Sequence, residues 1–255
     1  MLLIEDNPDV MEYLTSCLEE SYQLDFAFNG KAGIEKALEI VPDIIISDVM
    51  MPEKNGFEVT HFLKNDERTS HIPIILLTAK ADINSKVIGL ERGADAYLTK
   101  PFDKKELQVR LEKLIELRHK LQSHYGGDQA FVGDNGSISN SDVAIKTAVE
   151  FEDVFLKKLN DILEKHLNNS DFDIPQLCRE LHMSQSQLYR KIKALTDKSI
   201  ISYLRSFRLH KGKILLQTSS FSISKIAYEV GFTDPAYFSR KFSEEFGIPP
   251  SSIRK

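Results

Sequence analysis

The sequence is poor in cysteine and has no long apolar run. Its two cysteines, Cys17 and Cys178, stand far apart and form no Cys-x-x-Cys pair, so neither a disulfide framework nor a zinc site is predicted. No run of about 18 apolar residues and no signal-peptide pattern occurs, which argues against a membrane-spanning segment. These absences predict a soluble segment without membrane contact that works in a reducing cytoplasm.

Charge is unevenly distributed along the 255 residues. Residues 1–120 carry 15 basic and 22 acidic side chains, whereas residues 171–255 carry 14 basic and 8 acidic ones. A basic region joined to an acidic one indicates nucleic acid as a partner of the carboxyl-terminal part only. The length is sufficient for two domains of ordinary size.

Short apolar stretches alternate with amphipathic ones in the first 120 residues. Strands are expected at 2–6, 22–28, 42–48, 72–78 and 96–102, and helices at 8–20, 31–40, 56–66, 82–92 and 103–120. This alternation predicts an α/β fold in which helices cover both faces of a doubly wound parallel sheet.

A change of composition separates this region from the rest of the chain. Residues 122–150 are rich in Gly, Ser, Asn and Asp and lack sustained periodicity, which predicts a linker between domains at 1–121 and 151–255. The second domain begins with an apolar stripe from Phe151 to Leu163 and is helical throughout.

Reactive side chains stand where the predicted strands end. Glu5 and Asp6 end the first strand and Asp48 the third, while Thr78 and Lys100 end the fourth and fifth. Parallel strands end at one edge of a sheet, where open α/β sheets bind ligands. Three carboxylates there favour a divalent cation such as Mg²⁺. One of them could attack phosphorus while lysine and threonine bind the phosphoryl oxygens. A single aspartate would more simply cap a loop.

The stretches LLIEDNPD, DVMMPEKNGFEV, IILLTAK and AYLTKPF resemble the receiver domain of two-component response regulators over residues 1–120. The resemblance implies a flavodoxin-like (βα)5 fold, a histidine kinase as phosphoryl donor and Asp48 as the phosphoacceptor. It implies that Mg²⁺ is bound by Glu5 through water, Asp6, Asp48 and the carbonyl of Met50.

The same resemblance assigns the remaining receiver residues. Thr78 is implied to be the switch hydroxyl, Tyr97 the switch aromatic and Lys100 the phosphate-binding lysine, with a cis bond to Pro101. The receiver would therefore catalyse its own phosphorylation and dephosphorylation without being a stand-alone enzyme.

The basic region contains a weak internal repeat. Residues 173–192 and 222–242 align with one inserted residue, and each indicates a helix, a tight turn and a second helix. Ser184 and Asp234 are suited to cap the second helices. The pattern predicts an all-α domain with two helix-turn-helix units, separated by a continuous helix over 199–217, and the second helix of each unit would enter the major groove. A plain helical bundle is the alternative.

The repeat, together with ISKIAYEVGFTDPAYFSRKFSEEFGIPPSSIRK, resembles the AraC family of transcription regulators from about residue 150 to the end. The resemblance implies that double-stranded DNA is the partner. Arginine and glutamine suit base edges, and lysine suits phosphates. The implied contacts are Gln185, Ser186, Gln187, Tyr189, Arg190 and Lys191 on the first recognition helix and Ala236, Ser239, Arg240 and Lys241 on the second.

Together these features predict a phosphorylation-dependent, sequence-specific DNA-binding transcription regulator that forms a homodimer when Asp48 is phosphorylated. The alternative is the output segment of a hybrid sensor histidine kinase, because Met1 lies closer to the first strand than receivers usually begin. A phosphatase on the same pocket is disfavoured, since Val49 and Met50 stand where a second acid would be expected. A ligand-sensing regulator without phosphorylation is disfavoured by the complete receiver set.

Overall fold

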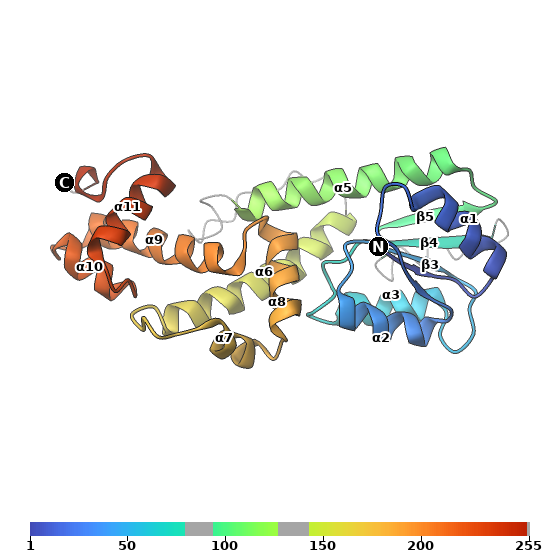
Figure 1. Cartoon of the computed structure of the whole chain (residues 1–255), viewed down its shortest axis with the longest axis horizontal. Helices are drawn as coiled ribbons and strands as arrows, with labels where there is room; N and C mark the ends of the chain where they lie inside the picture. The colour runs from blue at the N-terminus through green and yellow to red at the C-terminus, as the bar shows by residue number, and fades with distance from the viewer. Residues whose placement is uncertain (80–93, 127–142, 254–255) are drawn as a thin grey trace. The chain divides into compact units, whose positions relative to one another are not determined.

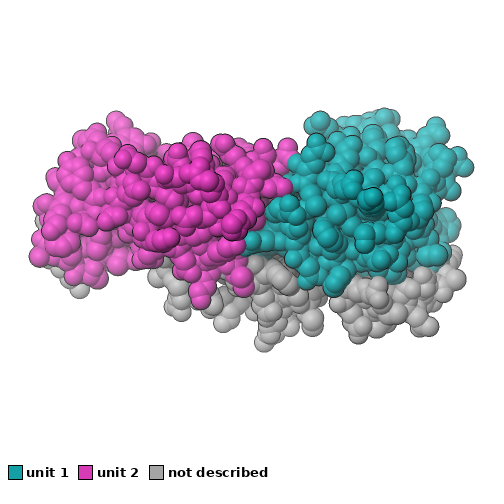
Figure 2. All heavy atoms as spheres, turned by 90° about the horizontal axis from the view of Figure 1, so that it is seen from below, with its two compact units in different colours: residues 1–123, 138–152 teal, residues 124–137, 153–255 magenta. Residues whose placement is uncertain are grey.

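The computed structural model describes residues 1–79, 94–126 and 143–253 (Figure 1). They fall into two compact units, one formed mainly by residues 1–123 and the other mainly by residues 153–255 (Figure 2). Within the described part of the chain, no helix is long and apolar enough to cross a bilayer.

The first unit is built on a parallel sheet, as the alternating pattern predicts. Its strands are β1 Leu2–Ile4, β2 Asp25–Ala27, β3 Ile45–Asp48, β4 Ile74–Ala79 and β5 Ala96–Lys100. They lie in the order β2-β1-β3-β4-β5, and each neighbouring pair is parallel. The strand order changes direction between β1 and β3, which is the position where doubly wound sheets bind ligands.

Helices cover both faces of this sheet. The described helices of the unit are α1 Pro8–Leu18, α2 Gly30–Ile40, α3 Gly56–Asn65 and α5 Lys104–Gly126. Successive side chains of a strand point to opposite faces of the sheet, so alternate residues contribute to two separate apolar cores. Leu3 packs with residues of α1 and α5, and Ile4 with residues of α2 and α3. The helix expected at 82–92 lies outside the described residues.

Helices extend further into the expected linker than composition indicated. The last receiver helix was expected to end near residue 120, but α5 continues to Gly126. Helix α6 begins at Val143, before Phe151. The Ser123 hydroxyl satisfies its hydrogen-bonding need within the helix by donating to the His119 carbonyl at 2.9 Å. The domain boundaries themselves stay predictions.

The second unit is helical. Its main part begins within α6 Val143–Lys165, whose residues up to Glu152 are assigned to the first unit. The helices that follow are α7 Ile174–Leu181, α8 Gln185–Thr196, α9 Ile200–Thr218, α10 Ile223–Glu229 and α11 Pro235–Phe246, and a 3₁₀ turn lies at Pro250–Ser252. The pairs α7–α8 and α10–α11 are the two expected helix-turn-helix units, and α9 is the expected continuous helix between them. Ser184 caps α8 and Asp234 caps α11, as predicted. The α6 stripe buries Phe155, Leu159 and Leu163, whereas Val154 is 65% exposed.

Candidate functional sites

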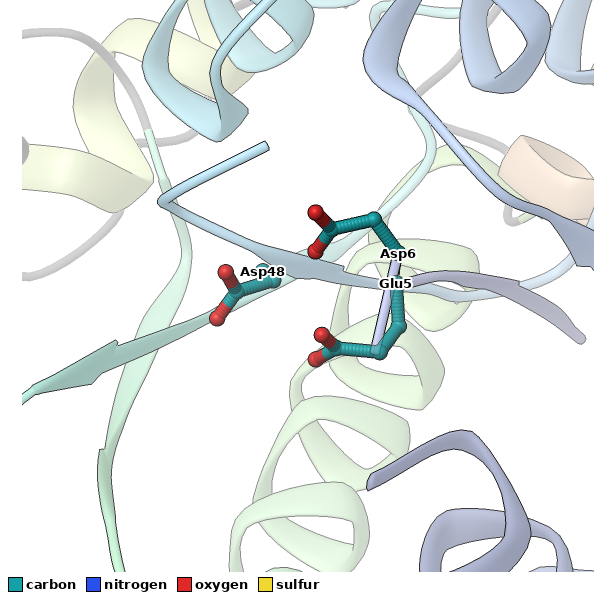
Figure 3. A group of neighbouring side chains, drawn as sticks. All are labelled: Glu5, Asp6 and Asp48. Carbon is teal, nitrogen blue, oxygen red and sulfur yellow. The ribbon is translucent and has the colours of Figure 1, made fainter. Parts of the chain in front are cut away.

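Three carboxylates meet at the carboxyl-terminal edge of the sheet. Glu5 and Asp6 directly follow β1, and Asp48 is the last residue of the neighbouring strand β3. Figure 3 shows the three side chains close together, and one carboxylate oxygen from each residue lies within 4.8 Å of those from the other two. Glu5 and Asp48 are buried, while Asp6 is exposed. This is an oxygen-ligand set of the kind that hard divalent cations prefer.

Lys100, at the end of β5, reaches into this cluster. Its Nζ lies 2.6 Å from Asp48 Oδ1 and 2.7 Å from Glu5 Oε2. Burial lowers the pKa of Lys100, but the hydrogen bonds to Asp48 and Glu5 outweigh burial, so the net pKa is raised and the side chain stays cationic. Burial raises the pKa of Glu5 in spite of its bond to Lys100. The single positive charge of Lys100 does not balance three carboxylates, so the site favours a further cation.

The loop after β3 orients the Asp48 carboxylate. The Met50 N–H donates to Asp48 Oδ2 at 2.9 Å, which leaves Oδ1 facing Lys100. Thr78 is 2% exposed on the adjacent strand β4, and its hydroxyl donates to the carbonyl of Ala79 at 3.3 Å. The expected cis bond between Lys100 and Pro101 is present.

The expected site residues are therefore brought together to different degrees. Glu5, Asp6, Asp48 and Lys100 form one cluster, with the Met50 backbone beside it. Tyr97 is half-buried and packs against the core on the α2 and α3 face. The roles of Thr78 and Tyr97 as a switch, and of Met50 as a metal ligand, stay predictions.

Sequence reasoning missed the role of Gly30, the first residue of α2, which lies against the loop that follows β3. A Cβ at Gly30 would lie 2.0 Å from the carbonyl oxygen of Lys54, so only glycine fits. Within this loop the Lys54 N–H donates to the Pro52 carbonyl at 2.8 Å, and Glu53, which lies between these two residues, has a φ of +65°. Such a three-residue turn is strained and needs support. The Asn29-Gly30 pair is visible in the sequence, but the pair does not reveal that Gly30 contacts Lys54, which is 24 residues away.

The proposed recognition helices present most of the expected side chains. Gln185, Ser186, Tyr189 and Arg190 are exposed on α8, as are Ala236 and Arg240 on α11. Ser239 is half-buried, and its hydroxyl donates to the Pro235 carbonyl at 2.9 Å. Exposure makes these residues available to DNA, and base contact by them stays a prediction.

One expected contact is wrong. Lys191 has an exposed fraction of 0%, and its Nζ lies 4.4 Å from the ring centroid of Phe155. The reason is helical periodicity: Lys191 stands three residues after Leu188 and four before Leu195, so it shares their buried face. The ammonium is accommodated on the aromatic ring instead of a DNA phosphate.

Two other expected contacts have structural partners in this chain. The Gln187 side chain accepts a hydrogen bond from the Ser184 N–H at 2.9 Å and completes the capping box of α8. Lys241 pairs with Glu244 on the same helix. An i,i+3 pair with one exposed partner is weak, so it leaves a phosphate contact by Lys241 open to test.

Comparison with known families agrees with the fold. Residues 1–112 match the response regulator receiver domain, which is the class that the parallel sheet and the acidic cluster define. Residues 177–255 match a helix-turn-helix domain. The chain thus joins a receiver domain to an AraC-type helix-turn-helix domain.

Relatives contain one or both of these parts. A histidine kinase of Formosa agariphila is 35% identical over 254 residues, which are 100% of this chain and 18% of that protein. The DNA-binding dual master transcriptional regulator RpaA of Synechocystis is 40% identical over 116 residues, which are 45% of this chain and 48% of that protein. The chain therefore spans about a fifth of the first relative and about half of the second.

A solved receiver domain of a sensor histidine kinase from Pseudomonas aeruginosa, with magnesium coordinated in its active-site cleft, is 31% identical. The alignment covers 44% of this chain and 93% of that domain's chain, with a TM-score of 0.42.

Proposed function

We propose that the chain is a phosphorylation-controlled transcription regulator in which Asp48 accepts a phosphoryl group from the phosphohistidine of a histidine kinase. The observation that carries the proposal is the cluster of Lys100 with Asp48, Glu5 and Asp6 at the sheet edge. An Asp48 oxygen attacks phosphorus, the phosphorus–nitrogen bond breaks, and the kinase imidazole, protonated from water on its other nitrogen, leaves as a neutral ring. The product is an aspartyl-phosphate.

The residues of this chain stabilise the charge that develops during transfer. Lys100 already contacts Asp48 and is suited to bind a phosphoryl oxygen once transfer has occurred. Glu5 through water, Asp6, Asp48 and the Met50 carbonyl would hold Mg²⁺, which supplies positive charge to the transferring group. The receiver would also catalyse loss of its own phosphate, without being a stand-alone enzyme.

Phosphorylation would be read out through the strand next to Asp48. The Thr78 hydroxyl is expected to turn from the Ala79 carbonyl toward the new phosphoryl oxygens, and Tyr97 to move into the space that it leaves. This local change of charge and packing would alter the surface of the receiver and favour a homodimer. A dimer would place the tandem helix-turn-helix units of two chains on neighbouring DNA sites.

The second candidate is that this segment is the output part of a hybrid histidine kinase. The relative from Formosa agariphila aligns with the whole chain, so its receiver and helix-turn-helix parts occur in the same order. The chemistry at Asp48 would be the same, with the kinase on the same polypeptide. In either form, phosphorylation of Asp48 and DNA binding are expected to take place in the cytoplasm, where DNA is available.

The test uses the full chain with Mg²⁺ and a small-molecule phosphodonor. We expect the wild type to gain the mass of one phosphoryl group and to change oligomeric state or DNA affinity, and Asp48→Asn to do neither. Mass gain without either change would keep the phosphoacceptor and reject the switch. Absence of mass gain with intact DNA binding would reject phosphorylation control.

A further inference from the structure

A small polar cluster joins the two helix-turn-helix units at the ends of their second helices. Lys198 lies in the turn just after α8, and Glu245 is the next-to-last residue of α11. Ser206 of α9 stands between them. The Ser206 hydroxyl donates to Glu245 Oε1 at 2.6 Å, and Lys198 Nζ donates to the Ser206 hydroxyl at 3.3 Å. Lys198 Nζ also lies 3.8 Å from Glu245 Oε1.

The cluster is buried at its centre, and its two charged side chains are partly exposed. Ser206 is 1% exposed, and the side chains of Lys198 and Glu245 are 24% and 25% exposed. The bond from the Ser206 hydroxyl to the Glu245 carboxylate is short and charge-assisted, and such a bond is directional. Leaving the buried Ser206 hydroxyl without its partner is costly, so alternative orientations of α11 against α9 are disfavoured.

A second contact, one helical turn further along α9, holds the same end of α11. His210 is 3% exposed, and its Nδ1 lies 2.8 Å from the Ser206 carbonyl oxygen. The imidazole meets the ring of Phe246, the last residue of α11, edge to face at a centroid distance of 4.9 Å. Polar and aromatic contacts therefore fix one end of α11 at two points on α9.

We infer that Lys198, Ser206, His210 and Glu245 form an orientation lock that sets the spacing between the two DNA elements that α8 and α11 read. This inference rests on the proposed function, because it requires both helices to contact DNA. Two rigidly joined reading helices fit one separation of their base-pair elements. Inserting one base pair moves the second element by roughly 3.4 Å and rotates it by about 34°. The lock residues are thus positioning residues that determine specificity without touching DNA.

The alternative is that the cluster only adds stability to the domain. Stability alone would lower the amount of folded protein and weaken binding to every duplex equally. A lock would instead change the ratio of affinities between duplexes that differ only in spacing. That ratio is the readout that separates the two roles.

The experiment starts from duplexes that the wild-type full chain selects from a random-sequence pool. Affinities are then compared between the selected spacing and versions with one base pair inserted or removed. The variants are Glu245→Ala and Ser206→Ala, and Glu244→Ala is the matched control, because Glu244 pairs with Lys241 within α11.

We expect the wild type and Glu244→Ala to lose at least about tenfold in affinity when the spacing changes, since preorganised binding tolerates little misfit. The lock variants should bind the selected spacing about three- to tenfold more weakly and discriminate between spacings less than about threefold. If both lock variants kept the wild-type ratio of affinities between spacings, the inference would be overturned.

A measurement without DNA separates failure of the lock from failure of the proposed function. Spin labels at Gln185→Cys and Ala236→Cys, in a chain with Cys17→Ser and Cys178→Ser, report the distance between the starts of α8 and α11. We expect one narrow distribution, broadened by Glu245→Ala and unchanged by Glu244→Ala. An unchanged distribution in Glu245→Ala would overturn the lock, whereas failure to select any duplex would reject the proposed function.

Discussion

At the residue scale, the two helix-turn-helix units have different residues at the left-handed backbone position where the first helix ends. Each unit needs a residue in the left-handed region where its first helix ends. The second unit uses Gly231, with φ of +78°, and the first uses His182, with φ of +54°. Glycine adopts this region without steric cost, whereas other residues pay about 1 kcal/mol. The first unit therefore carries a strain that the second avoids.

Exchanging these residues should change stability in opposite directions. We expect His182→Gly to raise the free energy of unfolding by up to about 1 kcal/mol, because the histidine is exposed. Gly231→Ala should lower it by more than about 1 kcal/mol, because the new Cβ would lie 2.5 Å from the Leu167 carbonyl oxygen. Urea denaturation measures both. A stabilised Gly231→Ala would show that the turn can relax.

Lys191 provides a second test at this scale. Because its stem is buried and its ammonium rests on Phe155, Lys191→Ala should lower the free energy of unfolding by about 2 kcal/mol through lost packing. The salt dependence of DNA binding should stay as in the wild type. The matched control is Arg190→Ala, an exposed neighbour expected to weaken DNA binding with little loss of stability. A reduced salt slope in Lys191→Ala would restore the phosphate contact that burial excludes.

At the scale of elements, the loop between β3 and α3 is held by close backbone contacts on two sides. Gly56 lies against the carbonyl of Asp48, where a Cβ would be 2.2 Å away, and Gly30 lies against the carbonyl of Lys54. Asn55 and Glu58 form a capping box that fixes where α3 begins. The loop carries the Met50 N–H that donates to Asp48, so contacts that hold the loop also hold the Asp48 carboxylate.

Removing the fit at Gly30 should therefore affect metal binding more than folding. We expect Gly30→Ala to weaken Mg²⁺ binding about tenfold, because displacing the loop moves Met50 relative to Asp48. The control is Gly33→Ala in the same helix, whose Cβ would meet the side chain of Ile4 at 2.6 Å and not a backbone atom. Titration calorimetry of Mg²⁺ gives the affinities. Equal affinities in Gly30→Ala and the wild type would show that the loop is held by other contacts.

At the scale of the whole molecule, the acidic cluster and the proposed recognition helices belong to different compact units. Ligand binding stabilises the unit that binds it by mass action, which amounts to about 2.7 kcal/mol at a free ligand concentration a hundred times Kd. The two units also differ in architecture, because one is a sheet packed between helices and the described part of the other is helical. Their responses to Mg²⁺ should therefore differ.

We expect calorimetry to show two unfolding transitions, of which Mg²⁺ raises only one. Removing Mg²⁺ with a chelator should reverse the rise, and Asp6→Asn, which changes an exposed member of the acidic cluster, should reduce it. A single transition that moves as a whole would show that the two units unfold cooperatively.

The sequence by itself determined what depends on local pattern. Alternation of apolar strands and helices predicted the parallel sheet, and the chemistry at the strand ends predicted the cluster of Glu5, Asp6, Asp48 and Lys100. Cap residues such as Ser184 and Asp234 marked the second helices, because a cap acts within its own turn. These signals are readable because neighbours in sequence, or ends of parallel strands, are neighbours in space.

Only the tertiary structure decided which side chains are inside and which distant segments meet. Basic character suggested that Lys191 faces DNA, but packing of α8 placed it on the buried face with Leu188. Contact of Gly30 with Lys54, and of Ser206 with Lys198 and Glu245, joins segments that no local pattern connects. Such contacts follow from how whole elements pack, and a side chain's charge does not reveal which surface its helix buries.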